Sequence, residues 1–425
     1  MWFRRDLRLE DNTALSAAFT NALPILPLFI FDTNILNELP KNDARVSFIH
    51  RSLLSIDQQL KKLKSGLHIE KGDPLKVWEK LIDTHDIDTV FVNRDYEPYA
   101  LKRDDSIKQL LLSRGVKLAT YQDQVIFEPH HILKPDGKPY SIYTPYKNKW
   151  LEAFSKLDKS TWSVDDKANN DLFLKPNKHS FPTITDLGFT TNKLQPAEIN
   201  LAIIPSYDQY RDYPEETTTF AGTYLRFGLI SIRKLVLQAQ SENQVYLSEL
   251  IWREFFTQIM FHYPHVINHN FKKAYDHIIW RNNPEDFQRW CTGTTGFPLV
   301  DAGMRELNNT GFMHNRVRMV TAGFLCKHLL IDWRWGEAYF ASKLFDYELA
   351  SNNGNWQWAS GTGCDAAPYF RVFNPERQAN QFDPYNNYIK KWIPEFGTSQ
   401  YAKPMIDHVF ARQRAIETYK NGLKN

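Results

Sequence analysis

The chain has 425 residues, enough to bury one large hydrophobic core or two smaller ones. Its formal net charge of +3 does not by itself indicate a nucleic-acid partner, so a DNA-binding surface would have to gather basic residues on one face. Its apolar runs are too short to span a membrane. Its three cysteines have no metal-ligand spacing and are odd in number, which favours a reduced, cytoplasmic protein over a disulfide framework.

The first part of the chain alternates strand-like and helix-like patterns. Short apolar runs, typical of buried strands, cover residues 25–31, 89–92 and 116–120, and a first short strand would end at Phe3. Apolar residues recur at helical spacing in residues 45–64, 75–81 and 101–112. Strands separated by helices indicate a parallel sheet with helical crossovers, so we predict a Rossmann-like α/β domain over residues 1–126.

The pattern changes twice after this domain. Between residues 127 and 206 it dissolves, and Pro, Asn, Asp, Lys and Thr accumulate, which predicts a long connector along the surface. After Ser206 the strand signals largely vanish, and four segments carry apolar residues at helical spacing: 230–239, 244–261, 299–308 and 316–330. We therefore predict an all-helical C-terminal domain over residues 207–425.

Common hydrolase and metalloenzyme motifs do not occur in the sequence. It has no phosphate-binding Walker loop, no Gly-x-Gly-x-x-Gly after a strand, no His-Glu-x-x-His and no Gly-x-Ser-x-Gly. These reaction classes therefore have no support.

The densest polar and aromatic cluster lies at residues 345–358, where two acids are followed by two asparagines and two tryptophans. In isolation such a cluster is more often a polar loop that leads into a buried aromatic helix. Carboxylates and amides in a short segment also suit a flavin, because the isoalloxazine ring has donors and acceptors along one edge. Both interpretations remain open on these residues alone.

Two further segments place polar groups at helical spacing. Arg316 and Arg318 fall on different faces of a helix, so one can bind a phosphate while the other points inward. Glu249 and Trp252 share a helix face, which suits an aromatic base that stacks on the ring and bonds to the carboxyl group. Taken singly, each segment is more often a solvated surface or an amphipathic helix.

At these residues the chain resembles the DNA photolyase/cryptochrome family over essentially its whole length, and it is most like the class I cyclobutane pyrimidine dimer photolyases. The matching motifs lie, in order, at residues 2–12, 296–305, 313–319, 331–334, 352–358 and 369–375. The resemblance implies that the α/β domain is an antenna domain and that the helical domain binds a U-shaped FAD.

The resemblance also implies which residues contact the flavin. Arg253 would bind phosphate, Arg318 and Asp346 would pair beside the isoalloxazine, and Glu348 would address N3 in place of a more common Asp. Asn352 would face N5. The remaining implied FAD contacts are Tyr207, Thr218, Thr219, Phe220, Ala221, Gly222, Tyr246 and Tyr347. Residues 218–222 depart from the family's usual Thr-Ser-Arg-Leu-Ser or Gly, since Phe220 replaces the Arg.

Reduction and repair are implied for other residues. Trp356, Trp333 and Trp280 match the chain of three tryptophans that photoreduces the flavin, and this match overrides their interpretation as simple core residues. Glu249, Asn352 and Met319 match catalytic positions. The implied contacts to damaged DNA are Arg211, Glu249, Trp252, Asn315, Arg316, Trp358, Arg371 and Gln378.

The implied reaction is light-driven electron transfer from reduced FAD to a flipped cyclobutane dimer, which splits the dimer and returns the electron. The protein would thus be a flavoprotein and a carbon–carbon lyase that acts as a monomer on UV-damaged DNA. Residues 93–100 look more like the pattern of relatives with a deazaflavin antenna than like the folate pattern, although a second flavin or no antenna fits too. The alternatives are a cryptochrome blue-light photoreceptor, a (6-4) photolyase, and a flavin-storage or structural DNA-binding protein. Asn315, Arg316 and Met319 favour the cyclobutane dimer over the (6-4) photoproduct.

Overall fold

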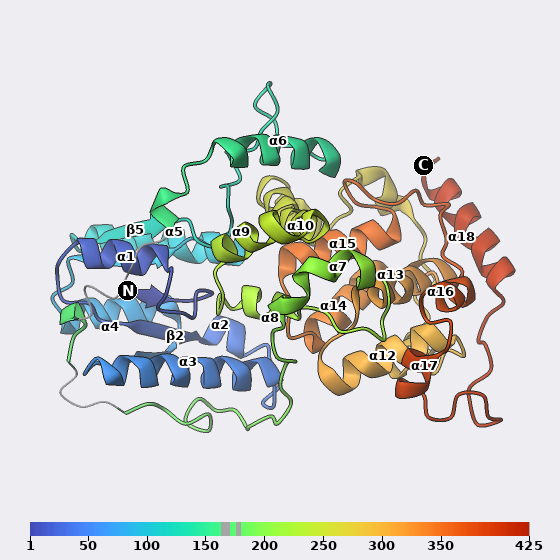
Figure 1. Cartoon of the computed structure of the whole chain (residues 1–425), viewed down its shortest axis with the longest axis horizontal. Coiled ribbons are helices and arrows are strands. Elements are labelled where there is room, and N and C mark those ends of the chain that lie inside the picture. Colours follow the sequence, from blue (N-terminus) through green and yellow to red (C-terminus); the bar gives the residue numbers. More distant parts are fainter. Residues whose placement is uncertain (163–170, 176–179, 425) are drawn as a thin grey trace. The chain divides into compact units, whose positions relative to one another are not determined.

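The computed structural model describes residues 1–162, 171–175 and 180–424. The chain divides into two compact units, each built from three separate stretches. The first unit contains Met1–His131, Glu152–Gln195 and Gly222–Gln238, and the second contains Ile132–Leu151, Pro196–Ala221 and Ala239–Asn425. In Figure 1 the blue and cyan elements belong to the first unit, and the yellow to red helices belong to the second. The domain boundaries at 126 and 206 stay a prediction.

The first unit is built on parallel strands connected through helices. β1 (Trp2–Phe3), β2 (Leu28–Asp32) and β3 (His68–Gly72) form one sheet in that order, with Trp2 opposite Leu28 and Leu28 opposite His68. β4 (Thr89–Asn93) and β5 (Lys117–Tyr121) form a parallel pair, and β4 lies against β1. The helices between the strands are α1 (Thr13–Thr20), α2 (Thr33–Leu36), α3 (Ala44–Lys62), α4 (Pro74–Thr84) and α5 (Pro98–Ser113). The predicted α/β fold is confirmed, and β3 is a strand that the sequence pattern did not predict.

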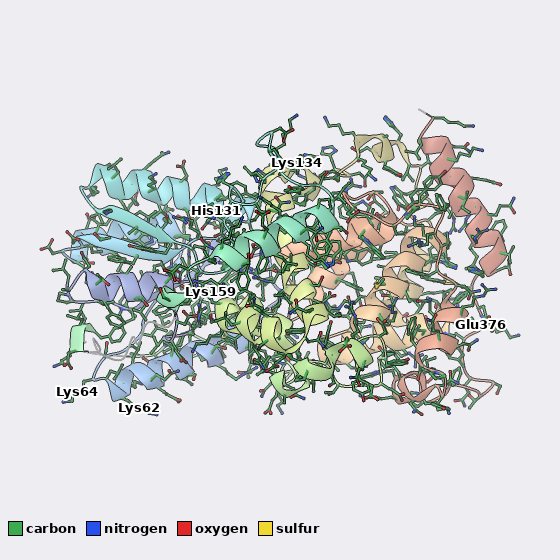
Figure 2. All side chains as sticks on the ribbon, turned by 45° about the horizontal axis from the view of Figure 1, so that its top comes forward. Lys62, Lys64, His131, Lys134, Lys159 and Glu376 are labelled. Atoms are coloured by element: carbon green, nitrogen blue, oxygen red, sulfur yellow. The ribbon has the colours of Figure 1, made fainter. Side chains whose placement is uncertain are left out.

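Local signals explain where these helices begin and end. Asp73 begins α4 by accepting a hydrogen bond from the main-chain N–H of Leu75 at 3.0 Å, and Pro74 takes the first position, where a missing N–H costs nothing. The C-terminal end of α3 shows a second signal. Its last turn carries Lys61 and Lys62, whose positive charges suit the negative pole of the helix dipole. Figure 2 shows Lys62 and Lys64 at this end of α3, pointing away from the ribbon.

The N-terminal motif at residues 2–12 forms buried ion pairs in the first unit. The Nη2 atom of Arg8 lies 2.8 and 2.7 Å from the two carboxylate oxygens of Asp123, and Nη2 of Arg233 lies 2.9 Å from one of them. Burial favours the neutral acid, but the two guanidinium groups hold the pKa of Asp123 below its usual range. The charges of this motif therefore attach the first residues to the loop after β5 and to the start of α9 (Ile232–Glu242).

Part of the segment between residues 127 and 206 is helical and buried, contrary to the prediction of a surface connector. α6 (Tyr143–Lys156) carries Tyr143, Tyr146 and Trp150, each at most 6 % exposed. Nε1 of Trp150 donates a hydrogen bond to Glu254 at 2.7 Å, which attaches this part of α6 to another helix of the second unit. Residues 163–170 and 176–179 of the predicted connector lie outside the described residues.

The second unit is helical, as predicted, and its described residues contain no β-strand. Its long central helix is α10 (Gln244–His262). The other helices are η3 (Leu201–Ser206), α7 (Tyr207–Tyr210), η4 (Pro264–Ile267), η5 (Lys273–His277), α11 (Pro284–Thr292), α12 (Pro298–Thr310), α13 (Asn315–Gly323), the π-helix η6 (Phe324–His328), α14 (Trp333–Lys343), α15 (Leu349–Ser360), α16 (Pro375–Phe382), α17 (Asn387–Trp392) and α18 (His408–Gly422). α8 (Ala221–Arg226) begins at Ala221, the last residue of the Pro196–Ala221 stretch of this unit, and continues into the first unit. In the described part of the chain no helix combines the length and apolar character that crossing a membrane requires.

The core of the second unit lies among α11, α12, α13, η6, α14 and α15. Large rings such as Trp290, Phe324 and Trp333 are at most 1 % exposed there. α14 and α15 approach closely because Gly336 has no side chain, and an added Cβ would clash with the ring of Trp356. This close approach brings the amide residues of α15, and the acidic residues just before it, to a pocket bounded by α13 and α14.

Candidate active site

A pocket in the second unit encloses about 630 Å³, including space open to solvent. It is bounded by α13, α14, α15 and the turn between the last two. The predicted site residues that line it are Asn315, Arg318, Met319, Asp346, Tyr347, Glu348, Asn352, Trp356 and Trp358. The structure therefore brings together residues predicted for flavin binding, reduction and lesion contact.

Arg318 and Asp346 form a two-pronged ion pair at the edge of this pocket. Nη1 of Arg318 lies 3.2 Å from Oδ1 of Asp346, and Nη2 lies 2.8 Å from Oδ2. Nε of Arg318 donates to the carbonyl oxygen of Met313 at 2.7 Å, which orients the guanidinium plane. A bidentate pair of this kind fixes both side chains, so the carboxylate of Asp346 is held in one orientation.

Glu348 is bound to Arg253, which comes from α10. Nη2 of Arg253 lies 2.8 Å from Oε1 of Glu348, and Oγ of Ser351 donates to Oε2 at 3.1 Å. Both charged side chains are largely buried, at 13 % and 8 % exposure. The residue predicted for a phosphate and the one predicted for the flavin edge thus contact each other.

Asn352 lies beside a second acidic residue of the pocket region. Its amide nitrogen donates to the carbonyl oxygen of Glu337 at 3.2 Å. Burial raises the pKa of the Glu337 carboxyl group to about 7, although the Asn353 amide and Arg334 oppose this shift. No hydrogen bond to the Asn352 amide oxygen occurs within the described part of the chain. That oxygen is therefore available as an acceptor for a bound molecule.

The predicted segment at residues 218–222 lies near aromatic rings. Phe220 has a left-handed backbone with φ of 51°, and its ring meets that of Phe312 at 5.0 Å between centroids. The guanidinium of Arg318 lies 5.5 Å from the centroid of Phe312, so this aromatic pair borders the Arg318 side of the pocket. Thr218 precedes this pair along the chain, and Ala221 and Gly222 begin α8.

Tyr207 and Tyr246 contact each other outside the pocket lining. Their ring centroids lie 4.9 Å apart at 77°, and the hydroxyl group of Tyr246 bonds to Oγ1 of Thr219 at 3.2 Å. The predicted residues of α7, α10 and the 218–222 segment therefore form a second group of contacts.

Two arginines predicted for DNA contact, Arg211 and Arg316, form close ion pairs with acidic residues of the protein. Nη1 of Arg211 lies 2.6 Å from Oε1 of Glu249, and Nη2 of Arg316 lies 2.7 Å from Oδ1 of Asp212. Asn315 is the exposed first residue of α13. The predicted charges are thus partly compensated within the protein.

His314, which precedes α13, is buried and neutral near pH 7. Burial, together with the charge of Arg318, lowers its pKa to about 4. Its Nδ1 accepts the main-chain N–H of Arg316 at 3.2 Å and so begins α13. This histidine has a structural role at the helix terminus.

Arg371 and Gln378 do not line the pocket. Arg371 is exposed in the loop between α15 and α16, and Gln378 is half-buried on α16. Their contact with DNA stays a prediction.

The three tryptophans predicted for reduction differ in how deeply they are buried. Trp356 and Trp333 are at most 2 % exposed, and Trp280 is half-buried. Nε1 of Trp333 donates to Asn270 at 2.8 Å, and the ring of Trp280 packs edge-on against Tyr419 at 5.8 Å. Their relay role stays a prediction.

Sequence reasoning missed two aromatic neighbours of Trp356. Its ring lies 4.9 Å from that of Phe340 and 6.1 Å from that of Trp290, between centroids. Phe340 also lines the pocket, as do Ala322, Leu344, Ser351, Asn355 and Ala359. Phe340 and Leu344 carry the helical apolar spacing of α14, which is the only signal they offered.

The lining of the pocket fits the isoalloxazine of a flavin. Polar groups of Arg318, Asp346, Glu348 and Asn352 lie with the apolar side chains of Ala322, Phe340 and Leu344 in one cavity. A flat heteroaromatic ring with a polar edge needs this combination of apolar surface and a few convergent hydrogen-bonding groups.

Two family models match the chain. The model described as "FAD binding domain of DNA photolyase" matches residues 246–399, and the model described as "DNA photolyase" matches residues 1–164. The first match contains the whole pocket.

Relatives and solved structures are similar over the full length. The deoxyribodipyrimidine photo-lyases of Vibrio cholerae and Escherichia coli are each 34 % identical, with alignments that cover 99 % and 100 % of this chain and 98 % of each relative. A bacterial class III photolyase from Agrobacterium tumefaciens superposes with a TM-score of 0.87 at 31 % identity, covering 100 % of this chain and 97 % of that one. An archaeal photolyase from Sulfolobus tokodaii, solved with two FAD molecules, superposes with a TM-score of 0.84 at 32 % identity, covering 99 % of both chains. A Synechocystis cryptochrome, at 24 % identity and a TM-score of 0.82, shares the fold.

Proposed function

This chain belongs to the DNA photolyase family, and we propose that it is a deoxyribodipyrimidine photo-lyase that uses blue light to split cyclobutane pyrimidine dimers in DNA. Its relatives with that name align over nearly their whole length. The observation that carries the proposal is a single pocket that joins Arg318, Asp346 and Asn352 to Asn315 and Met319.

FAD is the cofactor that the pocket would hold. Asp346, oriented by Arg318, and Glu348 would accept hydrogen bonds from the polar edge of the ring, and Asn352 would bond near N5. When bound and reduced, FAD supplies the electron that splits the dimer after it absorbs light. An amide at position 352 suits that role, because it forms hydrogen bonds without offering a readily transferred proton.

Asn315, Met319 and Trp358 would form the lesion side of the same pocket. Glu249 and Trp252 on α10 would bond to and stack on the bases of a dimer turned out of the duplex. Arg211 holds the carboxylate of Glu249 at 2.6 Å, which would keep it oriented before DNA binds. Asn315 and Met319, which line the pocket, support a cyclobutane dimer over a (6-4) photoproduct.

Contacts to the DNA backbone would come from Arg211, Arg316 and Arg371, with Gln378 beside them. Phosphate contacts predict binding that is largely independent of sequence and weakens steeply with salt. We propose that the protein acts on DNA as a monomer.

A second, deazaflavin-type chromophore in the first unit is part of the proposal. Asp32 is the last residue of β2, and the hydroxyl group of Tyr99 donates to its Oδ2 at 2.6 Å. Ligands of parallel sheets bind beyond the carboxyl ends of the strands, which supports a site near these two residues. A purified protein with an absorption band that flavin does not account for would support a deazaflavin. If the purified protein held a second flavin instead, that flavin would be the antenna.

Repair of defined lesions tests the main proposal. Oligonucleotides with one cyclobutane dimer or one (6-4) photoproduct are incubated with the FAD-loaded, reduced protein under blue light and in the dark. We expect intact pyrimidines from the cyclobutane substrate in the light only. No repair at full flavin occupancy would leave the cryptochrome alternative, and repair of the (6-4) substrate alone would reassign the lesion.

A further inference from the structure

We infer that Tyr143 is a positioning residue for Trp252, which it holds by a face-to-face stack so that one defined region of the indole is left for the DNA lesion. The inference rests on the proposed function, since it assumes that Trp252 contacts the dimer. Tyr143 lies in α6, within the segment that the sequence predicted as a connector.

The stack is closer than most aromatic pairs in proteins. The ring centroids of Tyr143 and Trp252 lie 3.6 Å apart, and the planes differ by 8°. Aromatic pairs usually adopt offset or edge-on arrangements with centroids about 4.5–7 Å apart. Tyr143 therefore occupies one face of the indole, and a base cannot stack at that place.

Two phenylalanines of α10 restrict Trp252 further. Phe255 meets the indole edge-on at 5.5 Å, and Phe256 lies at 5.4 Å with an interplanar angle of 30°. Trp252 is nevertheless only half-buried. The indole is thus held in place by several rings while part of its surface remains accessible.

Tyr143 is itself held at both ends. Its hydroxyl group donates to the carbonyl oxygen of Ser248 at 2.6 Å and also bonds to the Ser248 hydroxyl group at 2.7 Å. Its main-chain N–H donates to Oδ2 of Asp365 at 3.0 Å. Burial raises the pKa of the phenol well above its usual range, so it remains a neutral donor at physiological pH.

These contacts connect three parts of the proposed lesion site. Ser248 directly precedes Glu249, so the phenol attaches to the turn of α10 that carries the predicted carboxylate. Asp365 lies in the loop that also carries Arg371. Tyr143 thereby fixes the plane of the indole relative to the Glu249 turn and to the Arg371 loop. An indole that is already held in place loses little conformational freedom when a flipped dimer binds, so binding of the dimer is favoured over binding of ordinary DNA.

The test compares dimer selectivity in FAD-loaded protein kept in the dark. The dissociation constant is measured for an oligonucleotide with one cyclobutane dimer and for its undamaged twin. We expect Tyr143→Leu to weaken dimer binding by about tenfold, the order of magnitude of one base–aromatic stack, while binding of undamaged DNA changes less than about twofold. Tyr143→Phe keeps the ring and the bond to Asp365, so it should stay within about threefold of the unaltered protein.

Two controls separate positioning from packing. Tyr140→Leu alters a half-buried tyrosine just before α6 whose ring contacts Tyr146 instead of Trp252, and it should leave selectivity unchanged. In the double variant Tyr143→Leu/Trp252→Phe the loss should be no greater than in Trp252→Phe alone, because Tyr143 acts through Trp252. If Tyr143→Leu lost its fold by circular dichroism, Tyr143→Met, whose flexible side chain adapts to the same space, would replace it.

Additive losses in the double variant, or equal weakening for both DNAs, would overturn the inference. The behaviour of the unaltered protein tests the proposed function separately. If the unaltered protein did not distinguish the dimer from undamaged DNA, the photo-lyase proposal would fail before any variant was compared.

Discussion

Arg253 on α10 and Glu348 at the start of α15 form an ion pair 95 residues apart in sequence, with Nη2 and Oε1 2.8 Å apart and both side chains largely buried. The pair joins the central helix of the second unit to the segment that lines the pocket. A buried pair of this kind contributes little net stability as a pair, but removal of one partner is costly because the other charge stays buried.

Glu348→Gln should therefore lower the free energy of unfolding by roughly 3 kcal/mol, since it takes away the carboxylate that faces Arg253. Flavin occupancy after purification should fall as well. Glu348→Asp keeps the charge and should lose less on both measures. Chemical denaturation and the flavin absorbance check this prediction, and equal behaviour of the two variants would show that the charge is unimportant.

Lys327 predicts a pH dependence of stability. The residue is 2 % exposed, its amine donates to the carbonyl oxygen of Tyr369 at 3.1 Å, and burial lowers its pKa to about 7. Between this value and the ordinary lysine pKa the unfolded chain holds a proton that the folded chain has released, so the free energy of unfolding rises with pH there. Below pH 7 both states are charged and the cost of burial is fully present.

Lys327→Met should remove this rise, which amounts to a few kcal/mol, and should be more stable than the unaltered protein below pH 7. Denaturation midpoints between pH 6 and 9 measure the effect. Lys62→Met, at an exposed position, is the matched control and should follow the unaltered protein. Parallel pH profiles for Lys327→Met and the unaltered protein would contradict the prediction.

Gly336 and Gly323 offer a matched pair of glycines in helices of one core. Gly336→Ala should destabilise the protein by about 1–3 kcal/mol, because the new methyl group would overlap Trp356 and Leu325. Gly323→Ala meets its nearest atom, on Phe373, at 3.5 Å, which is ordinary contact, so it should be neutral or slightly stabilising. Thermal and chemical unfolding of the two variants provide the comparison.

The predicted tryptophan relay leads to an experiment with light. Trp356→Phe should slow photoreduction of the flavin but spare repair when the flavin is chemically reduced beforehand. Trp333→Phe should behave likewise, whereas Trp290→Phe should not, although Trp290 is the tryptophan in ring contact with Trp356. Transient absorption of the flavin measures the rates. If only Trp290→Phe slowed the reduction, the electron path to the flavin would run through Trp290 on α11.

Several elements of the first unit could be predicted because their local signals agree with their burial. All five residues of β2 are buried, and four of the five in β4 are, so their continuous apolar runs are diagnostic. β3 escaped prediction because His68–Gly72 is mostly half-exposed and contains a single large apolar residue. Its pairing with β2 overrides that weak propensity.

α6 was missed for another reason. Tyr143, Tyr146, Trp150 and Phe154 recur at helical spacing, and all four are buried. The prolines and polar residues around them dominated the composition, and the composition predicted a loop. The periodicity of the aromatic residues was the available signal.

The candidate site likewise has residues that the sequence could identify and partners that it could not. Asp346, Glu348, Asn352 and Trp356 lie within eleven residues, so a local motif could identify them together. The partners of these residues come from other helices, as Arg253 on α10 does for Glu348 and Phe340 on α14 does for Trp356. Such pairings depend on how the helices pack, which no local pattern encodes.

The interleaved course of the chain limits how this protein can be taken apart. The unit that carries the pocket includes Ile132–Leu151, and the other unit includes Gly222–Gln238. A truncated protein that began at residue 207 would lack Tyr143 and Trp150, and it would expose the apolar surfaces that they cover on α10. Exchange of the first unit between relatives would therefore need junctions at the points where the chain passes from one unit to the other, and a single cut in the middle would leave two incomplete fragments.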